Sequence, residues 1–450
     1  MDDIPAEILA TAFEMGVLDW GIRFLPPICL VCRTWNEIVS TTPHLWGIVD
    51  VSPKSHSPRP RLLLDQIARA KHAPLTVFVD KGANKRNRLD TVLAQLIQLS
   101  RNWISAVLPC DVLERCRWHD LKGKLQSLTV TQGCPGKDSP FFRTDGDVDS
   151  IDLRLPPALT RLSIVGSNPP RQFLSRSLKT FTLVPGRTNH IALSETLDHL
   201  SSIPNIEILS ISQLKHYPRL PDTPRIIHLN NLTSLKLSTV DYPSLLLSSL
   251  ACPSLEILSL GPCPVYSRWG SRPESAMRPL TPFLSQWCNP EYTPRRLHTL
   301  RIEQSLAMDD TPCLIRFLAR LPNIAHLAIC DDAVAEYLKY NTKTNEDGDI
   351  LKALASSTGG RRNADGADEW LCPRLGYLEI ELDAPFHRLL DIAQARGIHS
   401  TSPGGLRTLR RVAGYLCREG TDEEMELFRS LVQDLECECL ACGAGFLTMT

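Results

Sequence analysis

The feature that most constrains this chain is a six-residue pattern, L-x-x-L-x-L, whose L positions hold leucine, isoleucine or valine. Apolar residues that alternate with other residues are typical of a half-buried β-strand. Helix-like runs, such as residues 195–203, 244–250 and 313–321, lie between copies, so strands and helices alternate and predict a parallel sheet. One unit leaves its leucines exposed unless a neighbour stacks on it, so the array is expected to fold as a curved solenoid. The eight copies are residues 125–130, 159–164, 206–211, 232–237, 255–260, 297–302, 324–329 and 375–380.

Weaker copies and insertions extend this pattern. Weaker copies lie at residues 178–183 and 406–412, and degenerate first strands are expected at residues 74–79 and 104–108. Helical periodicity in residues 422–436, with acidic residues in the first turn, predicts a capping helix. Insertions rich in Gly, Pro, Ser or charged residues predict surface loops at residues 133–150, 261–279 and 355–369.

The repeated unit resembles that of leucine-rich-repeat proteins. The resemblance implies an α/β fold, with a parallel β-sheet on a concave face and helices outside it. Only residues 255–263 carry the Asn-or-Cys position of the consensus, and the spacing between copies varies, so an irregular horseshoe is expected. A globular domain with a parallel sheet is the alternative fold, but eight such strands in series favour the repeat array.

The first fifty residues have a different pattern. Apolar residues at helical spacing run through residues 8–18, and Pro5 stands in the first turn, where a helix tolerates it. A second helical segment is expected at residues 26–39, and Leu45 and Trp46 follow after an interruption. Three short helical elements cannot bury all of this apolar surface among themselves. Some of it is therefore expected to contact a partner.

Three motifs in this segment, IPAEIL at residues 4–9, LVCRTW at 30–35 and TPHLW at 42–46, resemble the F-box in order and spacing. The usual Leu of the Leu-Pro pair is Ile4 here, and the module starts at residue 1 of the sequence. The resemblance implies docking onto the Skp adaptor of a cullin-RING ubiquitin ligase. Alternatively, the module only caps the repeat array behind it. The resemblance assigns docking or supporting roles to Pro5, Ile8, Leu9, Val31, Cys32, Trp35, Leu45 and Trp46.

Outward positions of the strands form a second candidate surface. Residues that flank the central leucine of each copy point away from the core, because side chains alternate along a strand. Most such positions are only solvated, but the later copies carry charge and an aromatic ring, and Arg and Tyr are enriched at the centres of interfaces. The candidate target-binding residues are Lys236, Arg301, Glu303, His326, Tyr377, Glu379 and Glu381.

Charge and cysteine content limit the compartment and the partners. With 49 Lys and Arg against 50 Asp and Glu, the formal net charge of -1 gives no global preference for nucleic acid or an anionic membrane. Fifteen cysteines without regular spacing indicate a reducing compartment, the cytosol or nucleus. The sequence shows no secretory signal and no apolar run near the roughly 20 residues that cross a bilayer. A soluble cytoplasmic or nuclear protein is expected.

Three local features have rival interpretations. The C-x-C-x-x-C at residues 437–442, together with Cys417, has enough thiolates for a structural zinc, but incidental cysteines in a tail are favoured. Cys29 and Cys32 form a C-x-x-C on an apolar helical face, where buried packing is favoured. The basic run at residues 81–88 is a candidate for nuclear import or nucleic-acid contact, although without aromatics it is typical of a solvated loop.

The sequence lacks the usual motifs for nucleotide binding, zinc proteolysis and nucleophilic hydrolysis, so neither a catalytic residue nor a cofactor or metal is expected. We expect a substrate-recognition adaptor of a Skp-cullin-F-box ubiquitin ligase. A leucine-rich-repeat scaffold without ligase association and an RNA-binding solenoid are the alternatives. The predicted organisation is an F-box-like module at residues 1–47, an irregular solenoid at 48–415, a capping-helix region at 416–436 and a tail at 437–450.

Overall fold

The computed structural model divides the chain into two compact units, Met1–Asn189 and His190–Thr450. The predicted insertion at residues 133–150, residues 262–279 of the next insertion, the basic run at 81–88, and Cys417, Cys439 and Cys442 lie outside the described residues. The structure describes residues 4–51, 60–80, 89–116, 124–131, 158–166, 174–186, 191–214, 225–240, 243–261, 280–303, 310–330, 350–362, 368–384, 386–399, 407–416, 421–432, 434–438 and 447–449.

A helical module begins the first unit. Gly21 ends its first helix with a φ of 73°, a conformation that glycine adopts without strain. The predicted second helix at residues 26–39 is divided in two, because the backbone is extended at Cys32 before the later helix starts. The elements are α1 (Ala6–Trp20), η1 (Ile22–Phe24), α2 (Leu25–Cys29), α3 (Arg33–Thr41) and η2 (Pro43–Trp46).

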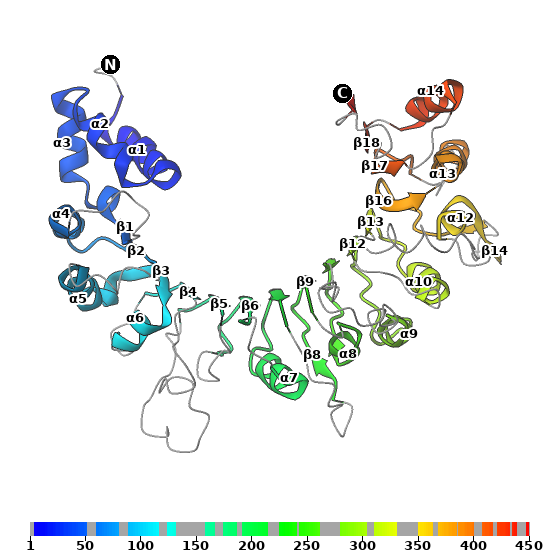
Figure 1. Ribbon diagram of the computed structural model, residues 1–450, viewed down its shortest axis with the longest axis horizontal. Coiled ribbons are helices and arrows are strands. Elements are labelled where there is room, and N and C mark those ends of the chain that lie inside the picture. The colour runs from blue at the N-terminus through cyan, green and yellow to red at the C-terminus, as the bar shows by residue number, and fades with distance from the viewer. Residues whose placement is uncertain are drawn as a thin grey trace, which may run out of the picture. The chain divides into compact units, whose positions relative to one another are not determined.

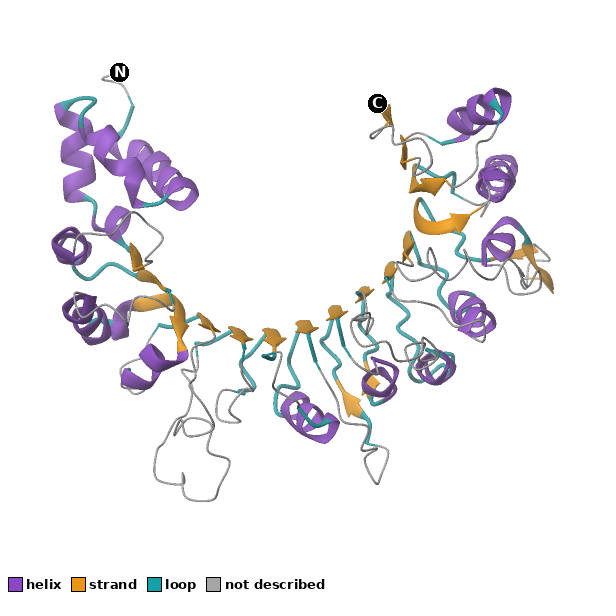
Figure 2. Ribbon diagram, in the orientation of Figure 1, coloured by secondary structure: helices purple, strands orange, loops and turns teal. Residues whose placement is uncertain are grey.

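Parallel strands follow the module in the first unit, and helices lie along one side of them (Figure 2). The predicted strands at residues 74–79, 104–108 and 178–183 are confirmed as β2, β3 and β6. In sheet order the strands are β1 (Ile48–Val51), β2 (Leu75–Val79), β3 (Trp103–Pro109), β4 (Ser127–Thr131), β5 (Arg161–Val165) and β6 (Thr180–Val184). The helices are α4 (Pro60–Ala70), α5 (Asp90–Gln98) and α6 (Cys110–Arg115), with η4 (Ser100–Asn102) before β3.

The second unit has the same alternation, with its helices on one face of its sheet (Figure 1). In sheet order its strands are β7 (Ile208–Ser212), β9 (Ser234–Ser238), β11 (Ile257–Leu260), β12 (Thr299–Ile302), β13 (His326–Cys330), β16 (Tyr377–Ala384), β17 (Arg411–Leu416), β18 (Asp434–Glu438) and β19 (Leu447–Met449). Its helices are α7 (Leu193–Ser201), α8 (Pro243–Ser248), α9 (Thr281–Trp287), α10 (Asp310–Leu318), α12 (Ile350–Ala355), α13 (Phe386–His399) and α14 (Asp422–Leu431). β8 (Ile227–His228) pairs in parallel with β10 (Leu250–Ala251) in a separate small sheet.

The central residues of the sequence pattern pair across neighbouring strands and form the core. These side chains are 0–2% exposed in the second unit. Burial of one leucine side chain stabilises by about 1.5–3 kcal/mol, and a one-residue slip of a strand would turn its leucines to solvent, so the register is fixed. The paired row runs through Leu209, Leu235, Leu258, Leu300, Leu327, Leu378 and Val412.

A recurring hydrogen-bond arrangement connects successive repeats. The carbonyl oxygen of the residue before a strand accepts two N–H groups, one from the residue before the next strand and one from that strand's first residue. The Glu256 carbonyl, for example, accepts from the His298 N–H at 3.0 Å and from the Thr299 N–H at 3.1 Å. Equivalent pairs of N–H groups donate to the carbonyls of Gln126, Thr160, Glu207, Thr233, His298, Ala325 and Gly376.

The C-terminal capping helix is confirmed over a shorter range than predicted. Thr421 Oγ1 accepts from the Glu424 N–H, and the Glu424 carboxylate accepts from the Thr421 N–H, so a capping box starts α14. The helix ends at Leu431, and the chain then forms β18, which pairs in parallel with β17. This pairing satisfies backbone groups that β17 would otherwise leave at a sheet edge.

Three sequence predictions near the C-terminus are wrong. Residues 437–450 are not simply a tail, because β18 ends at Glu438 and β19 pairs with it antiparallel. The predicted loop at residues 355–369 includes β14 (Ser357–Arg362) and part of β15 (Asp368–Trp370), which form an antiparallel pair. The register predicted for the weak copy at residues 406–412 is three residues too early, because Val412, and not Leu409, pairs with Leu378 of β16.

Candidate binding surfaces

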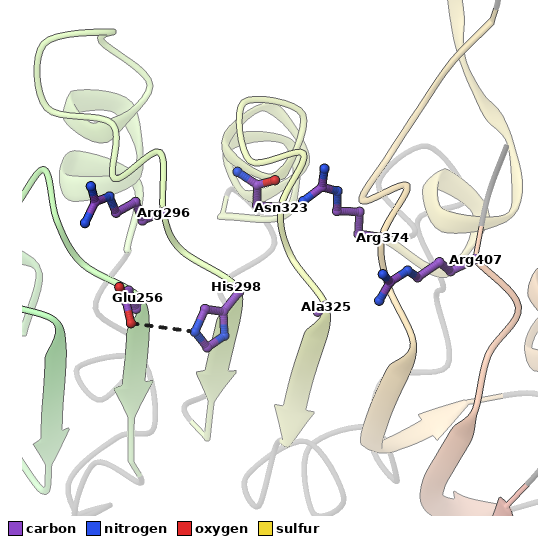
Figure 3. Close-up of a pocket in the computed structure, with 7 residues that line it drawn as sticks. All are labelled: Glu256, Arg296, His298, Asn323, Ala325, Arg374 and Arg407. Carbon is purple, nitrogen blue, oxygen red and sulfur yellow. Dashed lines mark ion pairs between the residues drawn. The ribbon is translucent and has the colours of Figure 1, made fainter. Parts of the chain in front are cut away.

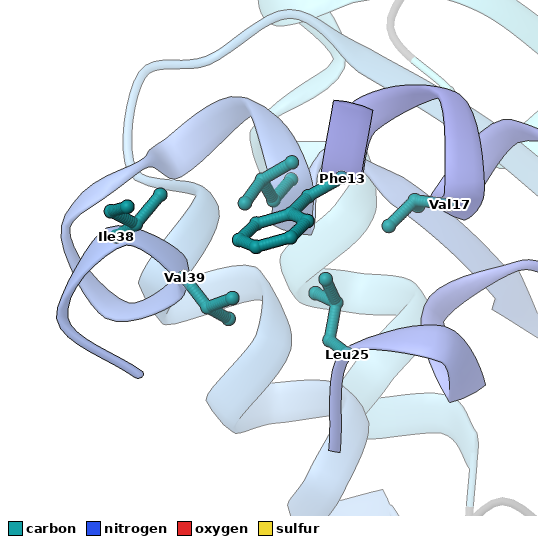
Figure 4. Packing of buried hydrophobic residues seen from close by; sticks show 6 residues of the cluster. Phe13, Val17, Leu25, Ile38 and Val39 are labelled. Atoms are coloured by element: carbon teal, nitrogen blue, oxygen red, sulfur yellow. The ribbon is translucent and has the colours of Figure 1, made fainter. Parts of the chain in front are cut away.

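Six buried side chains fill the interior of the helical module (Figure 4). Trp35 is half-buried and packs edge-on against Phe13, with the ring centroids 5.1 Å apart. α1 contributes Phe13 and Val17 to this interior, one helical turn apart. The buried set is Phe13, Val17, Leu25, Ile38, Val39 and Leu45.

A second set of apolar residues points outward from the same module. On α1, Ile8, Met15 and Leu18 recur at helical spacing on a face other than that of Phe13 and Val17. A helix that is apolar on two faces is expected to be covered on both. The outer apolar residues, which are 47–86% exposed, are Ile4, Ile8, Met15, Leu18, Trp20, Leu30 and Val31.

The eight residues with predicted docking roles differ in their exposure to solvent. Four of them, Pro5, Ile8, Val31 and Cys32, are exposed. The prediction that Cys32 is buried is therefore wrong, because Cys32 lies where the chain is extended between α2 and α3. Leu45 is buried and supports the module from inside. Leu9, Trp35 and Trp46 are half-buried.

Trp46 connects the module to the repeats of the first unit. Its Nε1–H donates to the Val39 carbonyl at 2.8 Å, and the Arg69 guanidinium of α4 lies 4.5 Å from the centre of its ring. The Gln66 side-chain amide of α4 donates to the Trp46 carbonyl at 3.2 Å and also to that of Ile48. These contacts give Trp46 a supporting role inside the unit.

Five of the predicted target-binding residues gather on β12, β13 and β16 and just after β12. Arg301 donates to Glu303 and, at 3.0 Å, to Glu379. Ala328 lies between Arg301 and Glu379 in the sheet register. The ion pair of Arg301 and Glu379 therefore spans the strand that carries Ala328, whose small side chain is buried. Nε2 of His326 lies 3.9 Å from Oε2 of Glu379, and the ring centroid of His326 is 5.9 Å from that of Tyr377.

These five residues, Arg301, Glu303, His326, Tyr377 and Glu379, form what we call the strand-face cluster. The charged side chains of the cluster are paired with one another, so a target that binds one of them has to compete with its partner in the cluster. The accessible aromatic ring of the cluster is Tyr377, which is 41% exposed. Lys236 is exposed on β9 in the same row as Arg301, with Ser259 between them. Glu381 belongs to β16, but its side chain is outside the described residues.

The strand-face cluster is expected to titrate in a specific way. Burial lowers the pKa of His326 below its usual value of 6.5; Glu379 opposes this shift, while Arg301 and Arg411 add to it. Replacing Glu379 by Gln is therefore expected to lower the His326 pKa further, and Arg301→Gln to raise it. Histidine ring NMR signals followed against pH measure both shifts.

The lowered pKa of His326 also determines how pH changes the stability of the fold. The folded chain holds the His326 proton less tightly than the unfolded chain, so this group's contribution to stability falls as pH drops through 6.5 towards the folded pKa. Lys236→Gln, two strands from Arg301, is the control and should leave the His326 titration unchanged. Equal titration of His326 in the Glu379→Gln variant and the parent would contradict the cluster's geometry.

A groove of about 490 Å³ lies at the residues that precede the strands of the later repeats (Figure 3). Glu256 and His298 face each other at one end, with 4.0 Å between the carboxylate and Nε2. Arg374 and Arg407 extend from the other end towards Asn323 and Ala325. We call this the loop-edge groove; it is lined by Glu256, Arg296, His298, Asn323, Ala325, Arg374 and Arg407.

Other sequence features give no site among the described residues. Within those ranges, no group of three or more His, Cys, Asp or Glu side chains is arranged to hold a metal ion. Burial raises the pKa of the Cys116, Cys252 and Cys372 thiols to about 12, so these side chains stay protonated at neutral pH and act as packing residues. No helix in the described part of the chain has the length and apolar character needed to span a membrane.

Comparison with known proteins adds no relative: no protein-family model matches the sequence, and no curated protein matches it. Function is therefore inferred from the residues and their geometry. The outer apolar residues of the module and the surfaces of the second unit are the features that bear on it.

Proposed function

We propose that this protein is a non-catalytic adaptor, in which the helical module docks a Skp-family adaptor of a cullin-RING ubiquitin ligase and the leucine-rich-repeat-like array holds a target protein. The observation that carries the proposal is the outer face of α1. Ile8, Met15 and Leu18 are exposed there, although the module already has a filled interior beneath Phe13 and Val17.

Exposed apolar side chains in this number have a physical consequence. Each large apolar side chain left in water forgoes about 1.5–3 kcal/mol that burial would provide. Grouped exposed apolar residues on a protein surface mark sites of association, and a few well-packed ones dominate the affinity of an interface. The exposed Ile8 and Val31 are also the residues to which the F-box resemblance assigns docking roles.

In this proposal the chain contributes proximity and orientation, while its partners perform ubiquitin transfer. A protein target would contact the second unit, where the strand-face cluster combines Tyr377 with paired charges. No disulfide joins Cys29, Cys32, Cys116, Cys252, Cys288, Cys313 or Cys372, which supports a reducing compartment such as the cytosol or nucleus.

Capture of a purified Skp-family adaptor by the full chain tests the proposal. The double variant Ile8→Asp, Val31→Asp places charges on the outer face and is expected to weaken adaptor binding at least tenfold. Both positions are exposed, so the module keeps its interior, which circular dichroism checks. The matched control is Asn36→Asp, Ser40→Asp, which adds the same charge at exposed positions of α3 and should bind as the parent does.

A repeat scaffold without ligase association is the second candidate. The contacts of Trp46 with Arg69 and Gln66 favour it, because they join the module to the first unit as a cap would be joined. If the parent does not bind the adaptor, or if the two double variants bind it equally well, the adaptor proposal fails and the scaffold remains.

A further inference from the structure

We propose that the loop-edge groove binds a phosphate group, presented either as a free anion or as a phosphorylated residue of a polypeptide. The groove lies wholly within the second unit and is lined by residues from successive repeats. The site is independent of the adaptor proposal, because it involves no residue of the helical module.

Three arginines lie along the groove. Arg296 and Arg374 directly precede the leucines that lead into β12 and β16, and Arg407 lies two residues before Leu409, which leads into β17. Repetition of the unit brings the three arginines to one edge of the sheet. In Figure 3 the Arg374 side chain extends towards Asn323 in the loop before β13, and the Arg407 side chain extends from its own loop towards the neighbouring repeat. Repeats that follow one another in space thus present guanidinium groups to the same groove.

Ion pairing distinguishes the groove arginines from Arg301 of the strand-face cluster. Among the residues that the structure describes, neither Arg296 nor Arg374 nor Arg407 forms an ion pair. Arg301, on the strand face, is different, because Glu303 and Glu379 already neutralise it. The groove arginines are therefore available to an external anion.

The charged side chains of the groove are mostly positive. Three guanidinium groups and one carboxylate, that of Glu256, line the groove, so its arginines exceed its carboxylates by two charges. A phosphate monoester carries about -1.5 to -2 charge at pH 7, which matches this excess. Guanidinium forks donate pairs of hydrogen bonds to phosphate oxygens, and such charge-assisted bonds are stronger than neutral ones.

Polar groups other than arginine complete the lining. The Asn323 amide donates one N–H to the Arg295 carbonyl at 2.9 Å, which fixes its orientation and leaves the second N–H for a ligand. Glu256 lies beside His298 at the opposite end from Arg374 and Arg407. The anion is thus expected to lie over Asn323 and Ala325, nearest Arg374 and Arg407.

The chain offers a matched control for this site. Arg295 neighbours Arg296, and Arg410 follows Arg407 by three residues, yet neither lines the groove and both are exposed. The double variants Arg374→Gln, Arg407→Gln and Arg295→Gln, Arg410→Gln remove the same number of positive charges. Any difference between them reports position and not net charge.

Two probes test the proposal on the full chain: inorganic phosphate by isothermal titration calorimetry, and a short labelled peptide, with or without one phosphoserine, by fluorescence anisotropy. The parent is expected to bind phosphate, the phosphopeptide or both. If the natural ligand is a phosphorylated polypeptide, the parent should bind the phosphopeptide at least tenfold more tightly than the unphosphorylated peptide. Arg374→Gln, Arg407→Gln should lose tenfold or more in affinity, whereas Arg295→Gln, Arg410→Gln should lose less than twofold.

Two results overturn the proposal. One is that the parent binds neither phosphate nor the phosphopeptide, and the other is that the two double variants lose affinity equally. Binding to phosphate alone supports a site for the free anion, and preference for the phosphopeptide supports a modified polypeptide as ligand. Capture of the Skp-family adaptor by Arg374→Gln, Arg407→Gln should equal that of the parent, so the two proposals fail separately.

Discussion

Replacing Arg396 by Ala is expected to lower the free energy of unfolding of the second unit by about 3–5 kcal/mol. Arg396 lies on α13 and is 0% exposed. Its Nη2 donates to the carbonyls of Leu371 and Cys372 at 3.0 and 3.1 Å, and its Nη1 to that of Leu375 at 3.5 Å. The alanine variant leaves these carbonyls without their donors and opens a cavity beneath the helix.

Native-state hydrogen exchange measures this effect locally. Amides of β16 and α13 should exchange at least about a hundredfold faster in the Arg396→Ala variant, since about 1.4 kcal/mol corresponds to a factor of ten. Burial lowers the pKa of Arg396 to about 10, so the side chain still carries its charge at neutral pH. Asp391→Ala, an exposed change on the same helix, is the control. Unchanged exchange in the Arg396 variant would refute its anchoring role.

The second large effect is expected at Trp287 in α9. Its side chain is fully buried and packs against Phe283 and Phe317, with ring centroids 5.6 and 6.1 Å away, so it joins α9 to α10. Trp287→Ala removes the largest member of this cluster and is expected to destabilise the second unit by about 3–5 kcal/mol. The midpoint of urea-induced unfolding is the measurement.

Two further variants separate packing from polarity at this position. The buried Trp287 Nε1–H has no acceptor among the described residues, so Trp287→Phe keeps most of the packing and removes an unsatisfied donor. Its cost is expected to be smaller, about 1–2 kcal/mol. Trp20→Ala, at an exposed tryptophan, should cost less than about 1 kcal/mol. Equal costs at Trp20 and Trp287 would contradict this ranking.

Much of the fold is predictable from the sequence because the repeated leucines are also the paired core residues. Leu235, Leu258 and Leu300 occupy the same position of the pattern and pair with one another in the sheet. The β14–β15 pair was missed because Ser357–Arg362 lacks the apolar alternation that marks a strand. The register of β17 was misassigned because Leu406 and Leu409 imitate the spacing of Leu409 and Val412.

The candidate surfaces were predictable only in part. The motifs identify Ile8 and Val31, but the helical pattern places the outward Leu18 in one stripe with the inward residues, and it gives no role to Met15, Trp20 or Leu30. The spacing of Ile4, Ile8, Met15 and Leu18 would have been sufficient to find the outward stripe. The loop-edge groove was not found, because its residues are widely separated in sequence and meet only through the stacking of repeats.

The recurring carbonyls that accept two N–H groups have an evolutionary consequence. The joints at Glu207, Thr233 and Glu256 contain the same pair of main-chain hydrogen bonds. Duplication or loss of a complete repeat therefore rebuilds an equivalent joint, whatever side chains the new neighbours carry. Proteins with this joint can change length by whole units while the rest of the chain keeps its alignment.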